Sequence, residues 1–164
     1  MIAKTSSRND GKETLLVVDD DAEIRRLEVR ALSKLGYNVL QARGPAEALR
    51  LAAATTAINL LVTDFEMPEA NGLELARQFR VVHPKAPVLM VSGSLHEIEG
   101  CTNGLDRFAF LAKPFSWDQL VEKVYTLLNS QRDALADSPS LQAVVQTSET
   151  NDLILSWATS ALHL

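Results

Sequence analysis

The chain has 164 residues, of which 46% are hydrophobic and 23% are charged. This balance is typical of a globular protein with a buried core and leaves room for one domain with a short appendage. The 16 basic and 21 acidic residues give a net charge of -5, which disfavours nucleic acid and anionic membrane surfaces as partners. A single cysteine, Cys101, excludes an internal disulfide framework, and no apolar run reaches the roughly 18 residues of a membrane span. We therefore expect a cytoplasmic protein.

The first β-α unit begins after a polar leader. Residues 1–13 have no apolar periodicity, so we expect them to be flexible. Residues 15–18 form a continuous apolar run, which is typical of a strand buried on both faces of a parallel sheet. Apolar residues then recur at helical spacing from Ile24 to Leu35 and stop at Gly36, a residue favoured just after helix ends.

The same alternation continues along the chain. Short segments rich in apolar residues predict further strands over residues 37–41, 58–63, 87–91 and 108–112. Helical periodicity predicts helices over residues 45–54, 73–82, 95–99 and 117–128. Five β-α units in series predict a doubly wound α/β fold, in which right-handed crossovers place helices on both faces of a parallel sheet.

The composition changes after Asn129. The segment SQRDALADSPS is polar and contains Pro139, so it is interpreted as a linker or a fraying helix end. Beyond it, apolar residues around Trp157 recur at helical spacing and predict an extra amphipathic helix. That helix would either cover the domain or expose a patch suited to a partner or a homodimer, and the sequence favours neither.

Polar and charged residues follow the predicted strands at their carboxyl ends. In an open parallel sheet these ends share one edge, where such folds bind their ligands. Carboxylates are hard oxygen ligands for Mg²⁺, a lysine supplies a fixed positive charge, and a serine hydroxyl donates a hydrogen bond. Such a set can position a phosphoryl group and neutralise its oxygens. The residues are Asp19, Asp20 and Asp21 after the first strand, Asp64 after the third, Ser92 after the fourth and Lys113 after the fifth.

At these positions the chain resembles the response-regulator receiver domain, the phosphoacceptor module of two-component signal transduction. The resemblance covers residues 14–129 and rests on four motifs that occur in order at the strand ends: VVDDD, VTDFEMPEANGLEL, VSG and FLAKPF. It implies a flavodoxin-like fold with strand order 2-1-3-4-5, similar to the single-domain regulators of chemotaxis.

The resemblance also implies a role for each matching residue. Asp64 would accept a phosphoryl group from a phosphohistidine on a sensor histidine kinase or phosphotransfer protein. Asp20 and Asp64 would bind Mg²⁺ together with the backbone carbonyl of Glu66, and Asp19 would assist through water or from behind the direct ligands. Lys113 would form an ion pair with the phosphoryl group. The only reactions implied are self-phosphorylation and autodephosphorylation of Asp64, so the protein would not be an enzyme in the usual sense.

The switch implied by the family involves Ser92 and Phe110. The Ser92 hydroxyl would donate a hydrogen bond to a phosphoryl oxygen, and the Phe110 ring would move inward, which would change a surface that binds a downstream protein. The bond between Lys113 and Pro114 is cis in the family. Two departures matter: Ser92 replaces the more common threonine and would loosen the coupling, and Glu66 lies where family members tune the lifetime of the phosphoryl group.

Some of these residues also have simpler interpretations. Asp21 directly precedes a helix and is interpreted as its N-cap rather than as a metal ligand. Arg25, Arg26 and Arg30 are interpreted as the solvent-exposed face of that helix.

Two other functions compete with phosphoacceptance. Asp19 and Asp21 also match the DxD pattern of haloacid-dehalogenase-like phosphatases, in which Asp19 would be the nucleophile and Asp21 the acid/base. That interpretation lacks a further acidic cluster after Lys113 and leaves Asp64 unexplained. The second alternative is a receiver-like domain that binds proteins without ever being phosphorylated.

Overall fold

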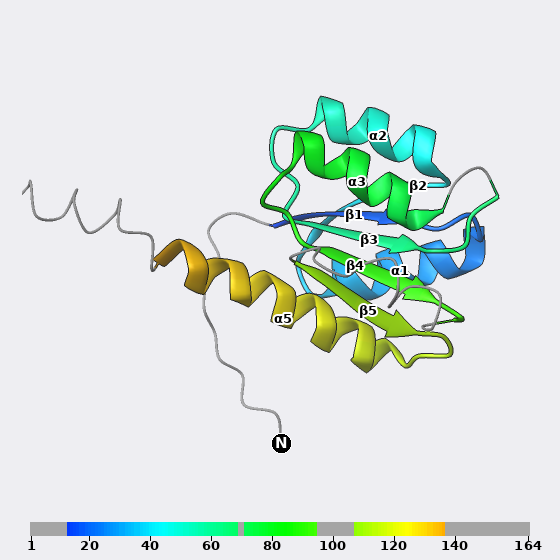
Figure 1. Ribbon diagram of the computed structural model, residues 1–164. Coiled ribbons are helices and arrows are strands. Elements are labelled where there is room, and N and C mark those ends of the chain that lie inside the picture. Colours follow the sequence, from blue (N-terminus) through cyan, green and yellow to red (C-terminus); the bar gives the residue numbers. More distant parts are fainter. Residues whose placement is uncertain (1–12, 69–70, 95–106, 137–164) are drawn as a thin grey trace, which may run out of the picture. The chain divides into compact units, whose positions relative to one another are not determined.

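Five strands form one parallel sheet in the order β2-β1-β3-β4-β5 (Figure 1). The computed structural model describes residues 13–68, 71–94 and 107–136, with side chains through residue 130. The strands are β1 (Thr14–Val18), β2 (Asn38–Ala42), β3 (Leu60–Asp64), β4 (Val88–Ser92) and β5 (Phe108–Ala112). Each strand pairs in parallel with its neighbours, so the predicted sheet and its order are confirmed.

Helices connect the strands, and local sequence signals fix where they begin. The described helices are α1 (Ala22–Lys34), α2 (Pro45–Ala54), α3 (Gly72–Val82) and α5 (Trp117–Ala136). The side chains of Asp21 and Asn71 cap α1 and α3 by accepting backbone N–H groups of the first turn. Pro45 opens α2, where a missing N–H costs nothing. Gly36 follows α1 with a φ of 97°, a conformation that glycine adopts without strain.

Two apolar layers cover the sheet because successive side chains of a strand point to opposite faces. Leu16 and Val18 belong to the core cluster that includes α2 and α3 residues, such as Phe79. Leu15 and Val17 belong to the other cluster, with α1 and α5 residues such as Leu32. Figure 1 shows the same division, with α2 and α3 on one face and α1 on the other. The sheet and both layers lie in one compact unit that ends at Leu128.

Helix α1 differs from the prediction. Its predicted apolar stripe included Leu27 and Leu35, but these side chains are 45% and 53% exposed. The residues of α1 that are buried are Glu28 and Leu32. The stripe is therefore rotated relative to the prediction, and a carboxyl group lies in the layer between helix and sheet.

Smaller differences concern element ends. Strand β3 begins at Leu60 rather than at residue 58 and continues through Asp64. Helix α5 continues to Ala136, eight residues past the predicted end. The predicted leader up to residue 12, the helix near residues 95–99, Cys101 and the tail helix lie outside the described residues. None of the helices described is long and apolar enough to cross a membrane.

Candidate functional site

The three consecutive carboxylates have three different environments. Asp19 follows β1 and is buried, Asp20 is exposed, and Asp21 is exposed at the start of α1. One Asp19 oxygen accepts the backbone N–H of Asp21 at 2.7 Å. One Asp21 oxygen accepts the N–H groups of Glu23 and Ile24, so its predicted N-cap role is confirmed. The Asp21 carboxylate is thus committed to the helix, which separates it from its two neighbours.

Strand pairing brings Asp64 next to Asp19 and Asp20. Val18 pairs with Thr63, so the residues that follow in each strand meet at the same edge of the sheet. One oxygen from each of Asp19, Asp20 and Asp64 lies within 4.8 Å of the others. Hard carboxylate oxygens in this arrangement are the donors that Mg²⁺ takes from proteins. The donor set therefore fits the implied magnesium ion.

Lys113 follows β5 and reaches across to these acids. Its Nζ lies 2.7 Å from Asp64 Oδ2 and 4.0 Å from Asp19 Oδ2. The bond between Lys113 and Pro114 is cis, as the resemblance implied. With three carboxylates and one ammonium, the cluster retains excess negative charge, which favours binding of a divalent cation.

Burial and neighbouring charges shift the acid–base properties of the site. Burial raises the pKa of Asp19, and the Asp21 N–H and Lys113 only partly offset this effect. Burial opposes the charge on Lys113, but the hydrogen bond and charge of Asp64 outweigh it and raise the lysine's pKa. Hydrogen bonds from the N–H groups of Ile24 and Glu23 lower the pKa of Asp21. Lys113 is therefore firmly cationic beside Asp64 at neutral pH.

Ser92 ends β4 on the other side of Asp64 and is fully buried. Its hydroxyl oxygen accepts the N–H of Ser94 at 2.9 Å. The hydroxyl proton faces two acceptors, the Ser94 carbonyl at 3.3 Å and Glu66 Oε1 at 3.4 Å. Glu66 is exposed, and its own N–H donates to Asp64 Oδ1 at 3.2 Å. Glu66 thus contacts Asp64 directly, and Ser92 is linked to Asp64 through Glu66.

Three other residues shape the site although sequence reasoning gave them no role in it. Gly72 approaches Asp64 so closely that an added Cβ would collide with the Asp64 carbonyl oxygen. Arg25, predicted to be solvent-exposed, instead donates from its guanidinium to the Asp19 carbonyl at 2.6 Å. Glu28 is 2% exposed and interacts electrostatically with Asp19, Lys113 and Asp64.

A signal for Glu28 was present in the sequence. It lies four residues after Ile24 and four before Leu32, within the apolar stripe of α1. Phe110, the predicted switch residue, is half-buried and packs against the core cluster on the α2 and α3 side of the sheet. Arg26 and Arg30 are exposed, as predicted.

Comparison with protein families gives a clear match. Residues 15–125, more than half of the chain, match the model of the response regulator receiver domain. The chain belongs to this family. The acidic cluster, Lys113 and the parallel sheet described above are therefore features of a receiver domain in a two-component system.

Relatives of this receiver domain occur in proteins of different architecture. The sensor kinase CckA of Brucella abortus is 36% identical over 123 residues, which are 74% of this chain but 13% of that protein. Chemotaxis protein CheY1 of Helicobacter pylori is 34% identical over 71% of this chain and 97% of its own length. The solved structure of TrrA from Thermotoga maritima, in complex with Mg²⁺-BeF, is 31% identical with a TM-score of 0.63, over 71% of this chain and 99% of that one. The region similar to this chain thus spans nearly all of CheY1 but only about an eighth of CckA.

Proposed function

We propose that this receiver domain accepts a phosphoryl group on Asp64, with Mg²⁺ bound by Asp20 and Asp64 and assisted by Asp19. The observation that carries the proposal is the convergence of these carboxylates with Lys113 at one edge of the sheet. The TrrA structure, similar over most of this chain, holds Mg²⁺-BeF, which supports a metal at the same kind of site. The Glu66 backbone carbonyl is proposed as a further ligand.

The phosphoryl donor is a phosphohistidine on a sensor histidine kinase or phosphotransfer protein. An oxygen of Asp64 forms a bond to phosphorus while the bond between phosphorus and the imidazole nitrogen breaks, and the electron pair of that bond remains on the ring. Mg²⁺, when bound, supplies positive charge against the phosphoryl oxygens. Lys113, now 2.7 Å from Asp64 Oδ2, pairs with a phosphoryl oxygen in the product.

Ser92 couples the phosphoryl group on Asp64 to the rest of the domain through its hydroxyl. Its hydroxyl proton is directed at the Ser94 carbonyl and Glu66 in the present structure. A phosphoryl oxygen is a stronger acceptor than either neutral carbonyl or solvated carboxylate, so the hydroxyl turns toward it. The Phe110 ring moves with Ser92, and the altered surface binds a downstream protein. We place this signalling in the cytoplasm.

The test is phosphorylation by a small donor. The full chain is incubated with acetyl phosphate and Mg²⁺, and its intact mass is measured. We expect the added mass of one phosphoryl group in the wild type and none in Asp64→Asn, which has the same shape but a poorer nucleophile. Asp21→Asn is the matched control, since its carboxylate caps a helix, and it should label like the wild type. Label that survives Asp64→Asn would place the acceptor elsewhere.

The same experiment separates the two alternatives. A haloacid-dehalogenase-like phosphatase would release phosphate steadily in a reaction that depends on Asp19 and Asp21 but not on Asp64. The commitment of Asp21 to the N-cap of α1 argues against this alternative. A receiver-like domain that only binds proteins would gain no mass under any condition.

A further inference from the structure

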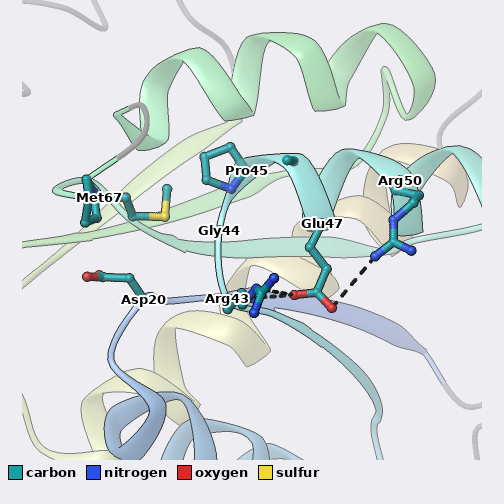
Figure 2. A pocket seen from close by; sticks show the side chains of 9 residues that line it. Asp20, Arg43, Gly44, Pro45, Glu47, Arg50 and Met67 are labelled. Carbon is teal, nitrogen blue, oxygen red and sulfur yellow. Dashed lines mark hydrogen bonds and ion pairs between the residues drawn. The ribbon is translucent and has the colours of Figure 1, made fainter.

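A recess of about 560 Å³ opens beside the acidic cluster, on the side of Asp20 (Figure 2). The ends of β1, β2 and β3 and the start of α2 border it. Its size lies in the range of pockets that hold small molecules. The residues that give it chemical character are Asp20, Arg43, Pro45, Glu47, Arg50 and Met67.

Two guanidinium groups at the recess are available to an incoming anion. The Arg43 and Arg50 side chains are 84% and 77% exposed, and each lies 4.0 Å from a Glu47 oxygen. Exposed pairs at this distance contribute little to stability. Glu47 Oε2 also accepts the backbone N–H of Arg43 at 3.0 Å. The guanidiniums can therefore change partner without leaving the Glu47 carboxylate unpaired.

Apart from Asp20, Glu47 and the two arginines, the lining residues are apolar or glycine. Pro45 and Met67 line the recess with carbon and sulfur atoms. The Pro45 residue is buried and Met67 is half-buried. Figure 2 shows Met67 on the side of Asp20, with Glu47 and Arg50 farther along α2. A ligand that satisfies both parts of this lining has an anionic end for the arginines and a short aliphatic body for Met67 and Pro45.

We propose that this recess binds a small aliphatic carboxylate. The carboxylate pairs with Arg43 and Arg50, and the aliphatic body packs on Met67 and Pro45. Asp20 belongs both to the recess and to the acidic cluster. A cation bound at the cluster offsets the Asp20 charge that would repel the ligand, so the two binding events favour each other reciprocally. This coupling, unlike the recess itself, rests on the magnesium site of the proposed function.

The probe is butyrate, which carries one carboxylate on a short aliphatic chain. Backbone amide resonances of the full chain are followed by NMR during titration without divalent cations. We expect saturable shifts at Arg43, Gly44, Glu47 and Met67 with half-saturation at roughly millimolar butyrate. Butylammonium, with a similar body and the opposite charge, should leave these amides unchanged. Equal responses to the two probes, or no response, would overturn the proposal.

Paired variants separate specific binding from net charge. Arg43→Gln/Arg50→Gln should weaken butyrate binding at least tenfold. Arg26→Gln/Arg30→Gln removes the same charge from the exposed face of α1 and should bind butyrate like the wild type. Equal weakening in both variants would show that butyrate responds only to the net charge of the protein, and the recess would not be its binding site.

The coupling is tested by repeating the titration with saturating Mg²⁺. We expect butyrate affinity to rise about threefold, as is ordinary for coupled sites. If Mg²⁺ shifts the amides of Asp20 and Asp64 without changing butyrate affinity, the coupling is refuted. If Mg²⁺ shifts neither amide, the proposed metal site fails, and the recess is judged by the metal-free titration alone.

Discussion

Single residues decide the charge balance of this domain. Lys113 opposes three carboxylates that would otherwise repel one another, and it makes its shortest contact with Asp64. Asp21, the third carboxylate of the run after β1, is removed from this balance by the N–H groups it caps. The unusual residue is Glu28, an acid in the apolar layer under the site. Burial, and then the nearby charge of Asp19, raise its pKa to about 8.

The buried Glu28 should make the domain less stable as pH rises. The folded protein keeps a proton on Glu28 up to about pH 8, whereas the unfolded chain releases it near the ordinary value of 4.5. The unfolded state therefore binds fewer protons in this window, and the free energy of unfolding falls through it. We expect Glu28→Gln to remove this loss, so that its advantage over the wild type grows by on the order of 3 kcal/mol between about pH 5 and pH 8.

Urea unfolding at several pH values, without divalent cations, measures this effect. Glu122→Gln on the exposed face of α5 is the control and should follow the wild type. Parallel stability curves for wild type and Glu28→Gln would contradict the proposed neutral state of the buried acid.

At the scale of elements, the turns after the strands carry the site. The β1–α1 turn is closed by the Asp21 cap and by Arg25 on the Asp19 carbonyl. The first residue of α3 lies so close to the end of β3 that Gly72 donates its N–H to the Phe65 carbonyl at 2.8 Å. The position of Asp64 therefore depends on how tightly α3 begins against the end of its own strand.

Gly72→Ala should disturb this closure. An added Cβ would collide with the Asp64 carbonyl oxygen and lie 3.0 Å from the Phe65 Cα, so backbone must shift. We expect a loss of roughly 1–3 kcal/mol in the free energy of unfolding and slower labelling of Asp64 by acetyl phosphate. Gly93→Ala is the matched control, because its Cβ would meet only a Glu66 oxygen at an ordinary 3.8 Å. Equal stability of the two variants would argue against the close approach.

At the scale of the whole molecule, the charge arrangement links folding to metal binding. The chain has a net charge of -5, and three of its carboxylates meet at one edge of the sheet. A cation held there binds the folded state and not the unfolded one, so it stabilises the domain by mass action.

Mg²⁺ should therefore raise the melting temperature of the wild type. At ten times its dissociation constant it adds about 1.4 kcal/mol, or about 5 °C for a domain of this size. In Asp20→Asn, Mg²⁺ should raise the melting temperature much less, because the substitution removes the negative charge of one metal-binding carboxylate. Asp21→Ala should be less stable than the wild type yet keep the full response, since Asp21 caps α1. If Asp21→Ala lost the Mg²⁺ response in thermal unfolding and Asp20→Asn kept it, Asp21 rather than Asp20 would be the metal ligand.

The sequence by itself determined the alternation of strands and helices, the parallel sheet and the residues at its carboxyl edge. Apolar runs, helical periodicity and caps such as Asp21 and Gly36 are local signals, and a parallel sheet brings its strand ends together whatever the details. The sequence placed Glu28 within the apolar stripe of α1, but its burial, the contact of Arg25 with Asp19 and the approach of Gly72 to Asp64 were decided by the tertiary structure. These features depend on the rotation of a helix on the sheet and on the distance between two backbones. Packing sets both quantities, and no short stretch of sequence encodes them.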